Sequence, residues 1–332
     1  MTLEHPFAQY IRILGKGRRG SRSLTLDEAR ETMRMILAGE TQPIQLGAFL
    51  MLIRVREETP EELAGFVAAA RAALQVPADL PPVALDWPSY AGKRRQLPWY
   101  VLSALLLASH GMPVLMHGVH RDDDRLYVPA ALAALGIPQA ASTSDAAEQV
   151  RRNGFAFLPL EVLNPMLAGF MELRDLLGLR SPVHTMARML NPFRAKAAVV
   201  GIFHPNYADI HQQAAVLLEE EALAVFKGEG GEAERKPDGV TSVKTVQGGM
   251  AGEEEWPALL ASRHLKDENL DVARLAALWR GEADEEYGLA SVLGSAAIAL
   301  KAMGRADSQE AAEALARKLW DERDRDYPQR LK

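Results

Sequence analysis

The chain has 332 residues, of which 48% are hydrophobic and none is cysteine, and its formal net charge is -6. This length and apolar content allow one large or two modest domains and exclude a disordered chain. The lack of cysteine excludes a disulfide framework, a thiolate metal site and a thiol nucleophile. The N-terminus lacks the apolar run of a secretory leader, and the longest apolar stretch, 97–109, is too short to span a bilayer. We therefore expect a soluble, cytoplasmic protein without a membrane partner.

The first part of the chain carries only helical patterns. Thr25 and Glu28 form a capping box ahead of an amphipathic stretch. Pro43 marks the first turn of the next helix, and Thr59 with Glu62 forms a second capping box. We therefore predict a separate all-helical domain over residues 1–75.

From residue 76 onward, strand-like apolar runs alternate with helical patterns. This alternation is typical of crossover units and of a mostly parallel sheet flanked by helices, so we predict an α/β domain over residues 76–332. Asp307 with Glu310 is expected to cap the last helix. The predicted strands are 83–87, 113–117, 156–160, 197–203, 222–227 and 241–247, and the helices are 98–110, 129–135, 144–153, 165–177, 207–218, 271–281, 285–303 and 308–323.

The segment 88–99, PSYAGKRRQLPW, connects the first predicted strand to a predicted helix. Such a loop is a frequent ligand site in α/β sheets, often for phosphate. Lys93, Arg94 and Arg95 put three cations beside the positive end of the helix dipole, which is unfavourable unless an anion is bound. Trp87 and Trp99 flank this loop, where they either stack on nucleic-acid bases or pack against the helix.

Charge is distributed unevenly along the chain. Acidic residues collect at 219–221, 253–255 and 282–286. A run without acids carries the basic residues Lys16, Arg18, Arg19 and Arg22. These clusters indicate either a basic binding face on an acidic protein or ordinary solvated surface.

Several segments resemble anthranilate phosphoribosyltransferases, which belong to the nucleoside-phosphorylase-like glycosyltransferases. The resemblance is carried by the helical opening 24–66, MHGV at 116–119, LRDLLGLRS at 173–181, LNPF at 190–193 and AVFKGEGGEAE at 224–234. It implies a helical dimerisation domain, a nucleoside-phosphorylase/phosphoribosyltransferase-like α/β domain, and a phosphoribosyl pyrophosphate site in the cleft between them. It also implies transfer of ribose 5-phosphate to an amine, with Mg²⁺ on carboxylates.

The chain departs from the family pattern at three places. The glycine-rich pyrophosphate loop is replaced by the segment 88–99, in which Gly92 is the sole glycine. The His-Gly-Asn turn reads HGV at 117–119, so its amide side chain is lost. The metal-binding Asp-Glu pair corresponds to Ala233 and Glu234, with Glu232 or Glu229 as a substitute for the lost carboxylate. These departures resemble a TrpD-like branch typified by YbiB, whose members are nucleic-acid-binding dimers.

Three hypotheses follow. The first is a homodimer with a degenerate pyrophosphate and Mg²⁺ site and no anthranilate activity, which binds nucleic acid in a groove that also includes Arg151, Arg152, Arg188 and Arg194. The second is an active transferase that transfers from phosphoribosyl pyrophosphate to another acceptor, with Mg²⁺ held by Glu232 and Glu234. The third is a structural dimer with neither activity. We assign no catalytic residue and, unless the protein is an active enzyme, no cofactor. The predicted phosphate and nucleic-acid contacts are Tyr90, Gly92, Lys93, Arg94, Arg95, His117, Gly118, Arg174 and Asn191, with Lys16, Arg18, Arg19 and Arg22 as accessory cations.

Overall fold

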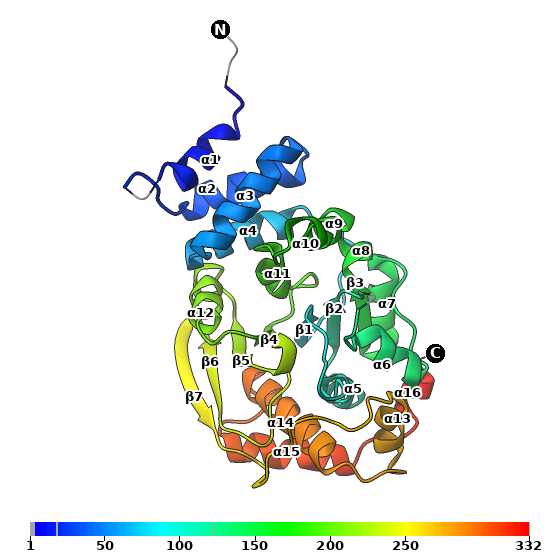
Figure 1. Ribbon diagram of the computed structural model, residues 1–332. Helices are drawn as coiled ribbons and strands as arrows, with labels where there is room; N and C mark the ends of the chain where they lie inside the picture. The colour runs from blue at the N-terminus through cyan, green and yellow to red at the C-terminus, as the bar shows by residue number, and fades with distance from the viewer. Residues whose placement is uncertain (1–3, 18, 122, 332) are drawn as a thin grey trace.

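Figure 1 shows the computed structural model, which describes residues 4–17, 19–121 and 123–331. The chain opens with the helices α1 (Ala8–Gly15), α2 (Leu26–Leu37), α3 (Pro43–Arg56) and α4 (Pro60–Ala72). Both predicted capping boxes are confirmed, because the Thr25 and Thr59 hydroxyls accept the N–H groups of Glu28 and Glu62, each at 3.2 Å. The sequence interpretation missed α1, which has no side-chain cap at its N-terminus.

The remaining described chain forms a seven-stranded sheet in the order β3-β2-β1-β4-β5-β6-β7. The strands are β1 (Leu85–Ser89), β2 (Val114–Gly118), β3 (Phe155–Pro159), β4 (Ala197–Ile202), β5 (Ala222–Lys227), β6 (Thr241–Gln247) and β7 (Met250–Trp256). The first five in chain order pair in parallel, as predicted, whereas β6 and β7 pair antiparallel. β7 was not predicted, because its sequence, MAGEEEW, has almost no apolar alternation.

The sheet separates two cores. Along β5, Ala224 and Phe226 face one core, and Leu223 and Val225 face the other, because successive side chains of a strand point to opposite faces. The helices α5 (Tyr100–Ser109), α13 (Ala273–Arg280), α14 (Glu286–Ala302) and α15 (Gln309–Asp321) cover the first face. The second core joins α1–α4 to the sheet and to α12 (Tyr207–Leu217). Figure 1 shows α1–α4 stacked at the end of the molecule where α12 lies.

Two predicted helices differ in detail from the structure. The predicted helix 165–177 is divided into α9 (Pro165–Glu172) and α10 (Arg174–Leu177). α15 is capped by Ser308, whose hydroxyl accepts the Ala311 N–H at 3.1 Å, and not by Asp307. The other helices are α6 (Val128–Leu135), α7 (Thr143–Asn153), α8 (Leu160–Leu163), α11 (Val183–Met186), α16 (Tyr327–Arg330) and two short 3-10 turns, Ala187–Met189 and Glu229–Gly231.

The described residues include no helix that is both long enough and apolar enough to cross a membrane. The proposed domain boundary between residues 75 and 76 falls in the segment that connects α4 to β1. We retain it as a proposal, because the core of α1–α4 continues into the core beneath the sheet.

Candidate functional site

Two cavities lie along the carboxyl ends of the strands. The chain leaves β1 toward β2 and leaves β4 toward β5, so the strand order reverses between β1 and β4. Ligand sites in open α/β sheets form at such a reversal. A larger cavity of about 1140 Å³ is lined by segments after β1, β4 and β5, and a smaller one of about 490 Å³ by segments after β1, β2 and β3.

The loop after β1 contains one buried and two exposed cations. Lys93 is 1% exposed, and its ammonium pairs with the Glu234 carboxylate and lies 3.6 Å from Glu229 Oε2. It is therefore not the mobile phosphate ligand that the sequence interpretation assumed. Arg94 is exposed and pairs with Asp124 at 2.7 Å. Arg95 is exposed, and both arginines line the larger cavity.

Glu232 lies beneath the same loop. Its Oε1 accepts the N–H groups of Ala91 at 2.7 Å and Gly92 at 2.6 Å, and its side chain is almost completely buried. Glu232 Oε2 has no hydrogen-bond partner in the described part of the chain. The two loop amides that an external anion would bind are therefore occupied by a carboxylate of the protein itself.

The predicted metal ligands Glu232 and Glu234 do not fit a Mg²⁺ site. Each already has partners: Glu234 Oε1 contacts the Lys93 ammonium, and Glu234 Oε2 accepts the Tyr100 N–H at 2.9 Å. Burial raises the pKa of Glu234, and the Lys93 ammonium opposes that rise. Within residues 4–17, 19–121 and 123–331, no group of three or more His, Asp or Glu side chains is arranged to hold a metal ion.

His117 and Tyr90 form a buried hydrogen-bonded chain behind the smaller cavity. His117 Nδ1 lies 2.5 Å from Tyr90 Oη, and His117 Nε2 lies 3.2 Å from Asp86 Oδ2. His117 is completely buried, whereas Tyr90 lines the cavity. Gly118 has a packing role, because a Cβ there would lie 2.0 Å from the Ser89 carbonyl oxygen of the neighbouring strand.

Among the described residues, the smaller cavity contains cations without acidic partners. Arg174 and Arg180 line it, and neither has a carboxylate within 4.0 Å among the described residues. Burial, together with the charges of Arg188, Arg125 and Arg174, lowers the pKa of Arg180 to about 10. The sequence interpretation selected Arg174 and missed Arg180, although both lie in the quoted segment LRDLLGLRS.

Basic side chains also line the larger cavity, and the sequence interpretation missed most of them. Lys227 at the end of β5 and Arg263 have no ion-pair partner in the part of the chain that the structure describes. The Arg125 guanidinium donates to the Ala91 carbonyl at 2.8 Å, which places this cation next to the loop after β1. The cavity also contains the exposed aromatic ring of Phe203.

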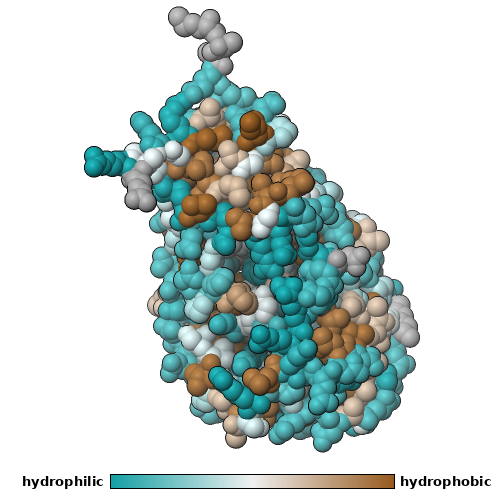
Figure 2. Space-filling view, in the orientation of Figure 1, coloured by the Kyte–Doolittle hydropathy of each residue, from teal (hydrophilic) through white to brown (hydrophobic). Residues whose placement is uncertain are grey.

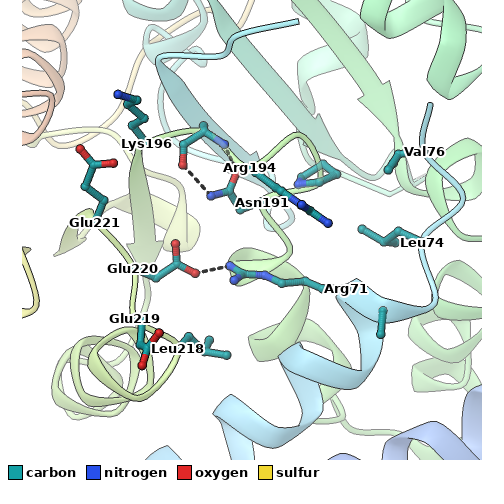
Figure 3. A pocket seen from close by; sticks show the side chains of 13 residues that line it. Arg71, Leu74, Val76, Asn191, Arg194, Lys196, Leu218, Glu219, Glu220 and Glu221 are labelled. Atoms are coloured by element: carbon teal, nitrogen blue, oxygen red, sulfur yellow. Dashed lines mark hydrogen bonds and ion pairs between the residues drawn. The ribbon is translucent and has the colours of Figure 1, made fainter. Parts of the chain in front are cut away.

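Asn191 lies at neither cavity. Its side chain closes a turn, with Nδ2 donating to the Ala195 carbonyl at 2.9 Å and Oδ1 accepting the Ala195 N–H at 2.7 Å. Figure 3 shows it in a third pocket, at the amino ends of β4 and β5, where Arg71 from α4 pairs with Glu220. Arg194 lines that pocket too, so the structure does not bring Asn191 or Arg194 together with the loop after β1.

The other predicted cations are dispersed. Lys16 and Arg19 are exposed between α1 and α2, Arg22 pairs with Glu28, and Arg18 lies outside the described residues. None of the described three lines either cavity at the carboxyl edge. Arg151, which pairs with Asp79, and the exposed Arg152 lie at the C-terminal end of α7, away from that edge. Arg188 lies at the edge but is buried, and its guanidinium donates to the Gly201 carbonyl of β4 at 2.9 Å.

Trp87 and Trp99 are both completely buried, which supports the packing interpretation of these residues and not base stacking. The Trp87 ring stacks on Tyr100 with the ring centroids 6.4 Å apart. The Arg274 guanidinium lies over the Trp99 ring, 5.7 Å from its centroid.

The helical opening, the mostly parallel sheet and the cationic cavities at its carboxyl edge define a phosphoribosyltransferase-like architecture. Models of the glycosyl transferase family match both parts of the chain: the helical bundle domain matches residues 8–74, and the a/b domain matches residues 100–322. The chain therefore belongs to this glycosyl transferase family.

Individual relatives agree with this assignment. The chain is 30% identical to YbiB of Escherichia coli over 60% of its own length and 64% of that protein. It is 29% identical to the anthranilate phosphoribosyltransferase of Rhizobium rhizogenes over 84% of its length and 85% of that enzyme. The Saccharomyces cerevisiae anthranilate phosphoribosyltransferase, solved in complex with PRPP and Mg, has the same fold, with a TM-score of 0.78, 17% identity and coverage of 99% and 96% of the two chains.

Proposed function

We propose that this protein is a homodimer that binds nucleic acid through phosphate contacts along the carboxyl edge of its sheet, with a degenerate pyrophosphate and Mg²⁺ site and no anthranilate activity. The observation that carries the proposal is the set of cations at this edge that have no acidic partner among the described residues. These cations are Arg95, Lys227 and Arg263 in the larger cavity and Arg174 and Arg180 in the smaller one. Phosphodiesters attract such side chains with little dependence on sequence.

The electrostatics of Arg180 favour an anionic ligand. The depressed pKa of this guanidinium reflects partial loss of water and three neighbouring cations. A phosphate group beside it would compensate both effects. The exposed Phe203 ring adds a surface on which an unpaired base can stack, so single-stranded nucleic acid is the better fit.

A second copy of the chain is the expected partner of the helical opening. α3 is apolar on nearly all sides, and a helix of this kind is normally buried on all sides. Ile44 and Val55 are nevertheless 83% and 80% exposed. Figure 2 shows apolar surface gathered over the helical opening of the chain. Pairing of two such patches would remove this apolar surface from water.

An active transferase that uses phosphoribosyl pyrophosphate is the alternative, and the relatives named as anthranilate phosphoribosyltransferases favour it. Against it stands the engagement of Glu232 by loop amides and of Glu234 by Lys93. Arg174, which has no acidic partner in the described part of the chain, lies beside the smaller cavity and is compatible with both functions.

Fluorescence anisotropy tests the proposal with a labelled single-stranded oligonucleotide and a duplex of the same sequence, each titrated between 50 and 300 mM salt, roughly the range over which phosphate contacts weaken. We expect binding at low salt, tighter for the single strand, that weakens steeply as salt increases. No binding at 50 mM salt, or affinity independent of salt, would rule the proposal out. Magnesium-dependent turnover of phosphoribosyl pyrophosphate by the purified protein would favour the transferase.

A further inference from the structure

The floor of the larger cavity is built from two loops whose charged groups satisfy one another. One loop follows β1 and carries Lys93, and the other follows β5 and carries Glu229, Glu232 and Glu234. Glu229 and Glu234 both line the cavity, so a ligand that entered it would meet their carboxylates.

Lys93 occupies the place where two carboxylates converge. Its ammonium contacts Glu234 Oε1 and lies 3.6 Å from Glu229 Oε2, and the side chain is 1% exposed. Convergent carboxylate oxygens are the donor set that a hard divalent cation takes. Here the Lys93 ammonium already neutralises the carboxylates of Glu229 and Glu234.

The Glu232 carboxylate occupies the place where a phosphate group would contact the loop after β1. Consecutive N–H groups in a loop form a concave site for phosphate oxygens, and the Ala91 and Gly92 amides both donate to Glu232 Oε1. The buried Arg188 guanidinium has no carboxylate partner within 4.0 Å in the described chain, and the charge of Glu232 is the largest attractive influence on it. A carboxylate of the protein therefore receives the contacts that a bound phosphate would receive.

The packing around the two loops keeps this arrangement closed. A Cβ on Gly230 would lie 2.4 Å from the Gly92 carbonyl oxygen, so the two loop backbones touch. A Cβ on Gly201 in β4 would lie 2.1 Å from the Glu232 carbonyl carbon. The Glu232 backbone is thus held against β4, close to the loop whose amides its side chain accepts.

We propose that Lys93 and Glu232 are built-in replacements for a divalent cation and a phosphate group, and that they make this cavity reject metal–diphosphate ligands. Phosphodiesters carry one charge per phosphate and need no metal, so they can still bind the outer cations Arg95, Lys227 and Arg263. This inference concerns the cavity floor and stands independently of whether nucleic acid is the outer ligand.

Thermal unfolding at constant ionic strength tests the inference with inorganic pyrophosphate and MgCl₂ or MnCl₂ as probes. The Tm of the wild-type protein should not respond to these probes beyond the response to NaCl. Lys93→Met leaves Glu229 and Glu234 without their cation, so divalent ions should raise its Tm by about 3 °C or more. Lys93→Met/Glu234→Gln is the matched control and should lose this response.

Glu232→Ala should free the loop amides and gain a comparable Tm rise with pyrophosphate alone. Glu232→Gln keeps a carbonyl oxygen that can accept the same N–H groups, so it should not respond. If Lys93→Met folds only in the presence of divalent ions, the inference is supported. If Lys93→Met does not fold under any condition, the inference is tested by the Tm responses of the wild-type protein, Glu232→Ala and Glu232→Gln.

Stabilisation of the wild-type protein by pyrophosphate with Mg²⁺ would overturn the inference. It would also be overturned by a folded Lys93→Met that ignores divalent ions, or by a folded Glu232→Ala that ignores pyrophosphate. Oligonucleotide affinity of the wild-type protein is measured separately, because the inference about the cavity floor does not depend on it. Failure of oligonucleotide binding would count against the proposed function and leave the inference about the floor intact.

Discussion

His211 in α12 is a buried imidazole whose Nδ1 lies 2.7 Å from the Tyr207 carbonyl oxygen. Burial lowers its pKa from 6.5 to about 4. Between those pH values the unfolded chain binds a proton that the folded chain does not, so the free energy of unfolding decreases as the pH decreases through that window. His211→Gln should reduce the slope of the free energy of unfolding against pH by about 1.4 kcal/mol per pH unit, as measured by urea unfolding at a series of pH values. His204→Gln, at an exposed position, is the control, and equal slopes for the two variants would contradict the prediction.

Gly118 at the end of β2 allows β1 to approach closely. Gly118→Ala would place a methyl group 2.0 Å from the Ser89 carbonyl oxygen, so the strands must separate. We expect a loss of about 2 kcal/mol in the free energy of unfolding, measured by urea denaturation. Gly169→Ala is the control, because a Cβ there meets no atom within 4 Å in the helix α9, and it should be neutral or slightly stabilising. A neutral Gly118→Ala would show that β1 and β2 are less tightly paired than the structure indicates.

Lys93 illustrates which residue-scale features the sequence could not provide. The three adjacent cations at 93–95 led to the prediction of a ligand site at this loop, and two of them are exposed at the larger cavity. The partner of Lys93 is Glu234, which lies 141 residues further along the chain. No local pattern predicts that pairing, so a cation in the same run is buried in an ion pair at 93 and exposed at 94 and 95.

The β6–β7 hairpin depends on its two-residue turn. Gly248 and Gly249 both have positive φ angles, 57° and 78°, which other residues except Asn adopt at a cost. We predict that Gly249→Ala lowers the free energy of unfolding by about 1 kcal/mol, whereas Gly248→Asn costs less than about half of that. Equilibrium unfolding of the two variants checks this. Equal losses would mean that the hairpin does not depend on left-handed backbone at position 249.

Elements with a local signal were predicted well. Thr25 and Thr59 began helices as their capping boxes indicated, and the apolar runs that became β1–β5 gave a mostly parallel sheet. Elements without such a signal were missed: α1 lacks a side-chain cap, and β7 is an exposed, acidic edge strand. Charged side chains on an edge strand discourage pairing of the sheet edge with other chains. A search for apolar alternation does not detect a strand of this kind.

At the scale of the whole molecule, the exposed face of α3 predicts self-association. Val55→Asp places a charge in that apolar patch and should convert a dimer to a monomer in sedimentation velocity at micromolar concentration. Leu176→Asp is the matched control, since Leu176 is 84% exposed on α10, outside the patch. A wild-type protein that sediments as a monomer, or a Val55→Asp variant that remains dimeric, would exclude this interface.

The strand–helix alternation predicts where in the fold a ligand site lies, but not which side chains line that site. Alternating strands and helices implied ligand contacts at carboxyl ends of strands, and both cationic cavities lie there. Lys227 and Arg263 come from segments far apart in the chain, and they converge at one cavity only because β5 and the segment before α13 meet there. Asn191 shows the converse, since a residue selected from a family segment lies at the opposite edge of the sheet.

The salt dependence of oligonucleotide binding tests most directly whether exposed cations at this edge hold a polyanion. Arg95→Ala/Lys227→Ala/Arg263→Ala removes three phosphate-binding charges, and Arg305→Ala/Arg317→Ala/Lys318→Ala removes the same number from exposed positions outside both cavities. For single-stranded DNA, the slope of log K against log salt should fall in magnitude by about 2 in the first variant and stay unchanged in the second. Equal slopes in the two variants, or an unchanged slope in the first, would contradict the account.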